Sequence, residues 1–269
     1  MLATLKVLAI ILVVGYVAIV VLMVLMQDRM LYPSHGIVEL LPSDLELAQR
    51  GLEAWPAHDP VALVASPDSA PVTVVVFHGN GGTALQRGYY AEALARRGLR
   101  VVLAEYPAYG WRSGDVSEAA FVADARQTLE LVHETYGGPL LVWGESLGAG
   151  VAAAAIRQLG APVEAVVLLT PWDTLPNTAS AAYPWLPVRW LARDRYDSVE
   201  NLRGFGGRVA VLVAEADAVI PPARGLTLYE KLDAEKRLWT FPGAGHNTWP
   251  ASPNAVWWDE VVAFALRES

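Results

Sequence analysis

The sequence predicts an α/β fold, with a mostly parallel central sheet covered by helices on both faces, preceded by one N-terminal transmembrane helix. The first supporting observation is that short runs of apolar, β-branched residues alternate with amphipathic stretches. The second is that these runs are apolar almost throughout, which is typical of strands covered on both faces. The third is a stretch of twenty uncharged residues, Val7–Met26, ahead of the first such run.

Composition limits the classes of partner and chemistry. The chain has 269 residues, a formal net charge of −8 and no cysteine. Its length fits one α/β domain beside the apolar segment. The negative charge argues against nucleic acid as a partner, because nucleic acids select basic surfaces. The absence of cysteine excludes disulfide bonds, a thiolate nucleophile and cysteine-ligated metals.

The apolar stretch is long enough to cross a bilayer. As a helix it would extend roughly 30 Å, the thickness of the hydrocarbon core. A cleaved signal peptide is the alternative, but its apolar part is usually about 7–15 residues long and ends at small residues. This stretch ends in Met26-Gln27-Asp28 instead. We therefore expect residues 1–30 to be an uncleaved, single-pass membrane anchor and residues 31–269 to form the folded domain.

The charges beside the stretch indicate which way it would cross the membrane. Lys6 and the terminal amine precede it, whereas Arg29 follows it with Asp28 alongside. Because positive charge is favoured on the cytoplasmic side, the balance leans towards a cytoplasmic N-terminus and an extracytoplasmic domain.

The rest of the chain is expected to alternate between strands and helices, after a linker over residues 27–60. We predict strands at residues 72–77, 100–105, 140–143, 163–169, 208–214 and 237–241, and helices at residues 84–97, 117–136, 148–159, 223–232 and 254–267. Residues 171–203 interrupt this order with four prolines and several aromatic and arginine residues. A connection of that length is unusual unless it has a function. We expect a small cap or lid over the carboxyl edge of the sheet.

One serine stands at the end of a predicted strand, in Gly144-Glu145-Ser146-Leu147-Gly148. A serine held on a sharp strand-to-helix turn needs small neighbours, because the strained backbone brings the flanking segments together. The helix that begins here directs free N–H groups towards the hydroxyl, which favours negative charge there. The pattern predicts that Ser146 is a nucleophile, with an ordinary tight turn as the alternative.

A base and an acid follow two later strands. His246 lies in a glycine-rich loop after residues 237–241, and Asp217 follows residues 208–214. In a parallel sheet these loops and Ser146 share the carboxyl edge. We therefore expect Ser146, Asp217 and His246 to form a catalytic triad, with Asp173 and Glu215 as competing acids. The order Ser, Asp, His is the one expected of α/β-hydrolases.

A third loop at the same edge, His78-Gly79-Asn80-Gly81-Gly82, can bring backbone donors close to a reacting carbonyl. We expect the N–H groups of Asn80 and Leu147 to form an oxyanion hole. A phosphate-binding loop is the rival interpretation, but no G-K-[ST] motif follows. His78 is expected to fix its loop rather than to react.

With these loops in place, the chain resembles the α/β-hydrolase superfamily. Within it, the chain resembles the Bem46-like or alpha/beta hydrolase domain-containing protein 13-like group of membrane-anchored serine hydrolases. The matching stretches are MLYP at 30–33, HGNGG at 78–82, YPAYGWRSG at 106–114, GESLG at 144–148, TPWDTL at 170–175, YPWLPVRWLARDRYDS at 183–198, D-x-x-x-P at 217–221 and GAGH at 243–246. The resemblance implies a serine hydrolase with the triad named above.

The chain departs from that group at one turn, where Pro107-Ala108 replace the usual Arg-Gly. Trp111 and Trp172 are bulky residues near the expected mouth of the site. We expect them to line and narrow the substrate pocket, with simple packing as the alternative. The cap carries further aromatic and basic residues, among them Trp185 and Trp190, which suit either a bilayer interface or a cover for the sheet.

These observations favour a membrane-anchored serine esterase or thioesterase acting on a small-molecule or lipid-like acyl substrate. An aminopeptidase or amidase of the same fold is one alternative, with Glu145, Asp173 or Asp194 as an anchor for a substrate amine. A catalytically idle, membrane-bound binding module is the other. No metal or cofactor is implied, because the histidines lack paired ligand spacing.

Overall fold

The computed structural model describes residues 2–67, 70–157 and 159–267. In this part of the chain eight strands form one sheet, in the order β1-β2-β4-β3-β5-β6-β7-β8. The strands are β1 Glu53–Trp55, β2 Ala62–Ala65, β3 Thr73–Phe77, β4 Arg100–Ala104, β5 Leu140–Glu145, β6 Val163–Leu169, β7 Arg208–Ala214 and β8 Glu235–Phe241. The pairs β1–β2 and β2–β4 are antiparallel and the other pairs are parallel. The predicted mostly parallel sheet is confirmed.

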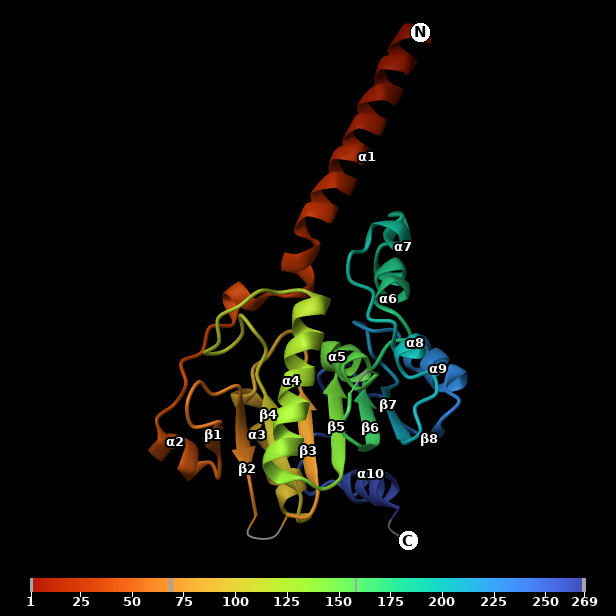
Figure 1. The fold of residues 1–269 in the computed structure, drawn as a ribbon. Coiled ribbons are helices and arrows are strands. Elements are labelled where there is room, and N and C mark those ends of the chain that lie inside the picture. Colours follow the sequence, from red (N-terminus) through yellow and green to blue (C-terminus); the bar gives the residue numbers. More distant parts are fainter. Residues whose placement is uncertain (1, 68–69, 158, 268–269) are drawn as a thin grey trace.

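Helices cover both faces of the sheet (Figure 1). They are α1 Leu2–Leu31, α2 Asp44–Gln49, α3 Gly88–Ala95, α4 Glu118–Tyr136, α5 Leu147–Ile156, α6 Leu175–Ala182, α7 Val188–Leu191, α8 Ser198–Asn201, α9 Pro222–Lys231 and α10 Trp257–Leu266, with short 3-10 helices η1 Ser34–Gly36 and η2 Leu85–Arg87. Alternate side chains of the central strands enter two cores. One core contains α4, α5 and α9, and the other contains α3 and α10.

The central strands are buried along their whole length, which is why their sequences are continuously apolar. The edge strand β8 begins at Glu235, two residues before its predicted start. Its first three residues are charged and exposed or only partly buried, so no apolar pattern marks where the strand begins. The predicted linker over residues 27–60 is partly structured. It contains the end of α1, the short helix α2 with a capping box at Ser43, and strand β1.

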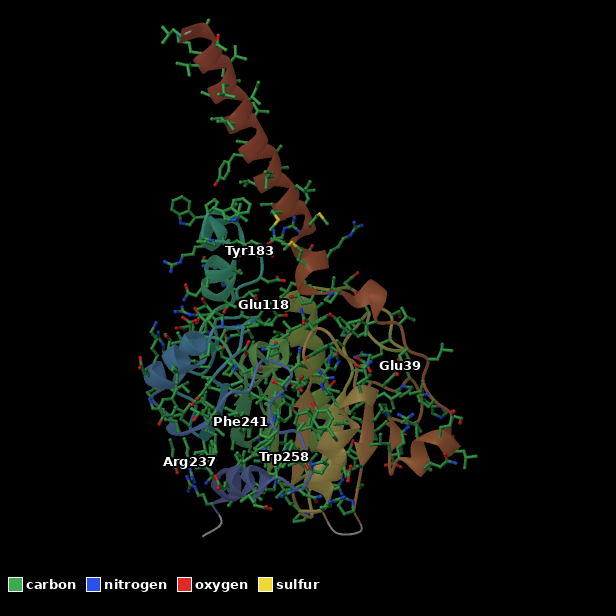
Figure 2. The ribbon with its side chains drawn as sticks, turned by 180° about the vertical axis from the view of Figure 1, so that it is seen from behind. Glu39, Glu118, Tyr183, Arg237, Phe241 and Trp258 are labelled. Carbon is green, nitrogen blue, oxygen red and sulfur yellow. The ribbon has the colours of Figure 1, made fainter. Side chains whose placement is uncertain are left out.

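The carboxyl ends of the parallel strands point towards the end of the domain from which α1 rises (Figure 1). The segment 171–203 lies at this same end and contains α6, α7 and α8. Helix α1 projects beyond the domain, and most of its apolar side chains are exposed (Figure 2). It is long and apolar enough to cross a membrane. The catalytic candidates, the segment 171–203 and α1 therefore share one end of the molecule.

Candidate active site

Ser146 lies at the sharp turn between β5 and α5. Its backbone has φ 55° and ψ −115°, a conformation that residues other than glycine rarely adopt. The turn needs glycine on both sides. A Cβ on Gly144 would lie 2.3 Å from the Gly148 carbonyl oxygen, and one on Gly148 would lie 2.0 Å from the Phe77 carbonyl oxygen. The two glycines therefore let α5 approach β3 with Ser146 at the carboxyl end of β5.

His246 and Asp217 come from the loops after β8 and β7. A hydrogen bond of 2.8 Å from the Ala216 N–H to the Ala244 carbonyl joins these loops. His246 Nδ1 lies 2.7 Å from Asp217 Oδ2, and His246 Nε2 lies 2.9 Å from Ser146 Oγ. The structure thus brings together the three side chains that the sequence singled out. Because a carboxylate only accepts, Nδ1 carries a proton and Nε2 is left to accept from the hydroxyl.

Asp217 has a second task in its own loop. Its Oδ1 accepts hydrogen bonds from the Val219 and Ile220 N–H groups, each at 2.8 Å, while Oδ2 faces the histidine. The residue is therefore both the turn-forming aspartate and the partner of the imidazole. The competing acids lie elsewhere: the Asp173 carboxylate accepts a hydrogen bond of 2.6 Å from an amide in α6, and Glu215 faces solvent.

The N–H groups of Asn80 and Leu147 are the two backbone donors expected for an oxyanion hole. Leu147 is the first residue of α5, so its N–H has no acceptor within the helix. No acceptor for the N–H of Asn80 or Leu147 is found in the part of the chain that the structure describes. Asn80 and Ser146 line one cavity. Neither N–H group is therefore engaged by a protein acceptor among the described residues.

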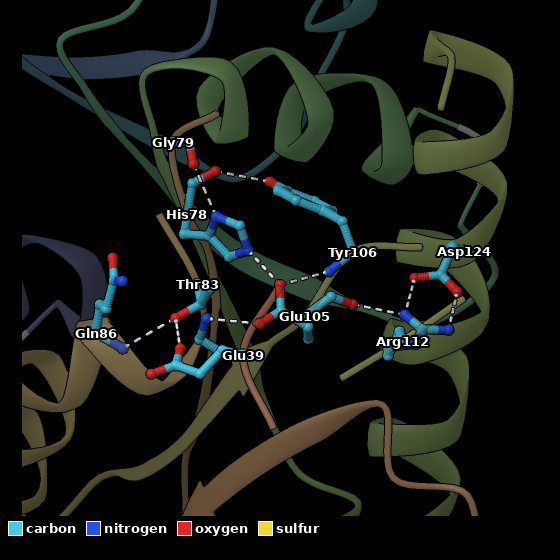
Figure 3. A network of polar contacts seen from close by, with 10 residues as sticks. Glu39, His78, Gly79, Thr83, Gln86, Glu105, Tyr106, Arg112 and Asp124 are labelled. Atoms are coloured by element: carbon cyan, nitrogen blue, oxygen red, sulfur yellow. Dashed lines mark hydrogen bonds and ion pairs between the residues drawn. The ribbon is translucent and has the colours of Figure 1, made fainter. Parts of the chain in front are cut away.

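A buried polar network fixes the loop that carries Asn80 (Figure 3). His78 Nε2 lies 2.8 Å from Glu105 Oε1, and its Nδ1 lies 2.7 Å from the Gly79 carbonyl oxygen. The Tyr106 hydroxyl donates to the His78 carbonyl at 2.9 Å. Both ring nitrogens of His78 therefore have hydrogen-bond partners in the loop itself or in Glu105. His78 is thus placed to hold the loop in shape, as expected.

The cavity beside Ser146 has a volume of about 560 Å³. Tyr89 and Trp249 supply its aromatic wall, and Arg87 and Glu145 its charged wall. Trp111 and Trp172, expected to line the pocket, are not among its lining residues. The Trp111 indole donates to the Pro60 carbonyl at 2.7 Å, and the Trp172 indole donates to the Tyr196 carbonyl at 3.1 Å. That expectation is corrected, because both side chains pack against other parts of the domain.

The carboxylate next to Ser146 is held by four donor groups. Glu145 accepts hydrogen bonds from Arg87 Nε at 3.1 Å and Arg87 Nη2 at 2.7 Å, and from the hydroxyls of Tyr89 and Tyr90 at 3.1 Å each. Burial acts to raise the pKa of the Glu145 carboxyl, but Arg87 and the two hydroxyls outweigh it, and the pKa lies below its usual value. The network keeps a negative charge fixed directly behind the serine turn.

Sequence reasoning missed Arg87, Tyr89 and Trp249 as residues of the site. A signal was present for the first two. Glu145 ends a strand that is otherwise apolar, and a buried carboxylate requires donors close by. The donors come from η2 and α3, more than fifty residues earlier in the chain. Periodicity does not reveal which element packs there, so the partners were not identifiable from local pattern.

Comparison with known sequences finds one matching family model and several sequence relatives. Residues 72–205 match a family model described as alpha/beta hydrolase fold. An uncharacterized protein of Mycobacterium tuberculosis is 35% identical over 177 residues, which cover 65% of this chain and 62% of that protein. The lysophosphatidylserine lipase ABHD12 of Danio rerio is 32% identical over 189 residues, which cover 63% of this chain and 49% of that protein. The chain spans less than two thirds of the length of either relative.

Solved structures of similar fold include esterases. Esterase Pf2001 of Pyrococcus furiosus superposes with a TM-score of 0.64 at 17% identity, covering 86% of this chain and 95% of that chain. Est1E of Butyrivibrio proteoclasticus, solved with ferulic acid bound, superposes with a TM-score of 0.64 at 16% identity, covering 77% of this chain and 94% of that chain. At these identities the likeness is one of fold.

Proposed function

Because the chain belongs to the α/β-hydrolase superfamily, we propose that it is a membrane-anchored serine hydrolase that cleaves acyl esters or thioesters. One observation carries the proposal: Ser146, His246 and Asp217 form a continuous chain of hydrogen bonds of 2.9 and 2.7 Å. The N–H groups of Asn80 and Leu147 have no acceptor among the described residues, and Asn80 lines the same cavity as Ser146. An alcohol, an imidazole and a carboxylate in this order have the geometry of acyl transfer.

In the first half of the reaction, Ser146 Oγ attacks the acyl carbonyl carbon while His246 Nε2 takes the hydroxyl proton. Asp217 holds the imidazole in the required tautomer and stabilises the cation that forms. The N–H groups of Asn80 and Leu147 donate to the oxyanion, each at a cost of about 3–4 kcal/mol in barrier height if lost. When the carbonyl reforms, the alkoxide or thiolate leaves with the proton from His246.

In the second half, His246 takes a proton from water, and the hydroxide attacks the acyl carbon of the Ser146 ester. The tetrahedral intermediate collapses, the carboxylic acid leaves, and the proton returns from His246 to Ser146 Oγ. The enzyme ends the cycle unchanged. The chemistry needs only groups present in this chain and one water molecule per turnover.

A lipid-like acyl substrate is supported by two features. One relative of this chain is named a lysophosphatidylserine lipase, and α1 provides twenty consecutive uncharged residues, enough to span a bilayer. We therefore propose residues 1–30 as the membrane anchor, residues 31–269 as the hydrolase domain and residues 171–203 as its cap. The sheet edge that carries Ser146 faces the anchor (Figure 1), which directs the site towards the membrane.

The amidase alternative is less well supported. Recognition of a free substrate amine would need an unpaired carboxylate in the cavity. Glu145 is the acidic residue among the described lining, and Arg87 and two tyrosines already occupy its oxygens. Asp173 and Asp194, the other candidates, do not line this cavity, and their carboxylates accept hydrogen bonds from Asn177 and Tyr32.

The decisive experiment measures turnover of p-nitrophenyl butyrate by the full chain in detergent. Ser146→Ala should reduce kcat by about 10⁶-fold, the loss found when a triad serine is removed. The matched control is Ser113→Ala, because Ser113 is an exposed serine outside the cavity and its loss should leave kcat unchanged. Equal turnover by Ser146→Ala and the parent would refute the proposed nucleophile.

A fluorophosphonate probe separates an enzyme from an idle binding module. The probe labels a serine only where a base activates it. We expect labelling of the parent and of Ser113→Ala, and none of Ser146→Ala or His246→Ala. Absence of labelling in the folded parent would favour the idle module. Comparing acyl esters with aminoacyl anilides then decides between esterase and amidase.

A further inference from the structure

A second cavity lies between α1 and the cap, beside the catalytic cavity. It has a volume of about 240 Å³, larger than the roughly 150 Å³ apolar cavity that accommodates benzene in a protein core. Apolar side chains of α6, α7 and the segment around them form one wall, among them Leu175, Ala179 and Leu191. Helix α1 forms the other wall. The space is therefore an apolar groove, named here the α1–cap groove.

One face of α1 is turned towards this groove. Six residues of its second half are partly buried, while their neighbours are exposed: Val20, Met23, Val24, Gln27, Asp28 and Leu31. They follow the spacing i, i+3, i+4, i+7, i+8 and i+11, which places them on a single face of a helix. All six line the groove. The half of α1 nearest the domain thus presents one defined face to the cap.

The two walls are joined near the ends of the groove. At the domain end, the Arg193 N–H donates to Gln27 Oε1 at 2.9 Å, and Arg193 Nη1 lies 2.8 Å from Asp28 Oδ2. At the far end, the Tyr16 hydroxyl donates to the Trp185 carbonyl at 3.0 Å. Apolar side chains face each other between these contacts. The structure therefore holds two apolar walls apart by polar contacts at either end.

The far end of the groove lies beside the middle of the apolar stretch. Tyr16 is ten residues before Met26, a distance of roughly 15 Å along a helix and about half the hydrocarbon thickness. With α1 across a bilayer, the cap tip would lie within one leaflet. Trp190 is 89% exposed and Trp185 52% exposed there, so neither covers the sheet. Arg189, the charged residue of α7, is exposed and can extend towards headgroups.

One hydrogen bond links a residue at the domain end of the groove to a residue of the catalytic cavity. Leu31 lines the groove, and its carbonyl accepts a hydrogen bond of 2.8 Å from Asn80 Nδ2. Asn80 lines the cavity that contains Ser146. A chain bound in the groove would therefore have its polar end next to the oxyanion loop.

We propose that the α1–cap groove binds the acyl chain of a substrate lipid, which enters sideways from the leaflet and brings its ester past Asn80 to Ser146. The proposal rests on the function proposed above. The occupant is a lipid chain because α1 carries this groove into hydrocarbon, where such chains are the surrounding medium. A chain that moves from the leaflet directly into an apolar groove does not enter water. Transfer into water would lower the equilibrium constant about fourfold for each exposed methylene.

The test compares two ester lengths in the full chain reconstituted in phosphatidylcholine nanodiscs. Ala179→Phe fills the groove from the cap wall, and Val24→Trp fills it from the α1 wall. Each should lower kcat/KM for p-nitrophenyl palmitate about tenfold or more, because a filled groove no longer holds the chain with its ester positioned at Ser146. Turnover of p-nitrophenyl butyrate should stay within about twofold of the parent, because a short chain does not reach the groove. The matched control, Ala182→Phe, places the same ring on the exposed face of α6 and should change neither rate.

The outcomes are distinct. Equal effects on the two esters, or no effect on palmitate, would overturn the groove as an acyl site. If the filled variants changed the mass of the protein-containing nanodisc but kept the parent's preference between the two esters, the groove would be a contact site for a helix of another protein molecule. That result would also overturn the groove as an acyl site. Absence of Ser146-dependent butyrate hydrolysis in the parent would instead reject the proposed function, whatever the groove binds. Val24 lies on a helix outside the domain core, so its variant leaves the fold of the hydrolase intact.

Discussion

Two cavities lie at the end of the molecule from which α1 rises, and they are held in different ways. Around Ser146, buried hydrogen bonds fix each of the loops that supply a polar group: Glu105 holds the Asn80 loop, Arg87 and two tyrosines hold Glu145, and the β7 and β8 loops bond to each other. The α1–cap groove has apolar walls joined near its ends. The loops around Ser146 are each held by buried hydrogen bonds, whereas the walls of the α1–cap groove are joined by polar contacts only near its ends.

This difference matches what the two regions are proposed to do. Acyl transfer depends on placing reacting atoms to within a fraction of an ångström, and buried polar networks provide that precision. An apolar groove binds by area, and the hydrophobic effect has no preferred direction. Substitutions should therefore have large effects at the catalytic cavity and graded effects towards the groove.

After the loss of Ser146 itself, the largest effect is expected at Asp217. In Asp217→Asn the amide oxygen can still accept from the Val219 and Ile220 N–H groups, so the loop keeps its turn. The amide NH₂ then faces His246 Nδ1 and forces the proton onto Nε2, where it blocks transfer from Ser146. We expect kcat to fall about 10⁴-fold with the melting temperature nearly unchanged, measured by ester hydrolysis and thermal unfolding.

Asp173→Asn is the matched control, because Asp173 is a buried acid at the same sheet edge that accepts a hydrogen bond from Asn177 in α6. It should retain kcat and lose some thermal stability. If Asp173→Asn abolished turnover while Asp217→Asn did not, the assignment of the acid would be reversed.

The proximity of Ser146, Asp217 and His246 was predictable from sequence because each follows a parallel strand of the sheet. Continuous apolar runs identify parallel strands, and their carboxyl ends share one edge, so Ser146, Asp217 and His246 could be placed together without coordinates. The residues that surround them were not predictable. Arg87 and Trp249 reach the cavity from helix and loop positions that local patterns do not distinguish from solvent-facing ones.

The second largest effect concerns the ion pair behind the serine turn. Arg87→Met leaves the buried Glu145 carboxylate without its cation, and removal of one partner of a buried pair typically costs about 3–5 kcal/mol in the free energy of unfolding. Urea unfolding at pH 7 measures this loss. The matched control, Arg97→Met, removes the same group from a pair with Asp259, whose side chain is 63% exposed, and should cost far less.

The same pair predicts how stability depends on pH. The pKa of Glu145 in the folded chain lies below its ordinary value of 4.5, so the pair contributes fully above that pH. The contribution is lost as pH falls through the lowered folded pKa, when the carboxyl takes up a proton. The difference in unfolding free energy between the parent and Arg87→Met should therefore be largest near pH 7 and shrink below pH 4.5. A gap that stayed constant down to pH 3 would contradict a charged Glu145.

The fold was predictable where strands are buried and less so at the edges. The antiparallel strands β1 and β2 were not assigned. Both are short, with three and four residues, and β1 lies within a proline-containing segment expected to be a linker. Contacts between α1 and the cap join residues more than 160 positions apart. An exposed face on an apolar helix carries no signal for such a contact, because lipid and protein partners select the same side chains.

A smaller effect is expected where the serine turn meets β3. In Gly148→Ala the added Cβ would lie 2.0 Å from the Phe77 carbonyl oxygen, so the backbone must shift. Overpacking of this kind costs about 1–3 kcal/mol, and the shift also displaces the Leu147 N–H. Unfolding free energy and kcat should both fall. Gly88→Ala is the control, because no atom lies within 4 Å of its Cβ, and it should be neutral or slightly stabilising.

The smallest effect tests the contact between the two regions. Asn80→Ala removes the hydrogen bond to the Leu31 carbonyl but keeps the backbone N–H proposed to bind the oxyanion. One hydrogen bond is worth about 0.5–1.5 kcal/mol, so we expect kcat for a short ester to fall about 2- to 10-fold with KM unchanged. Gln27→Ala also weakens the bond between α1 and the cap without touching the loop, and should leave kcat unaltered. If Asn80→Ala raised KM alone, its side chain would act on substrate binding, and α1 would have no part in holding the catalytic loop.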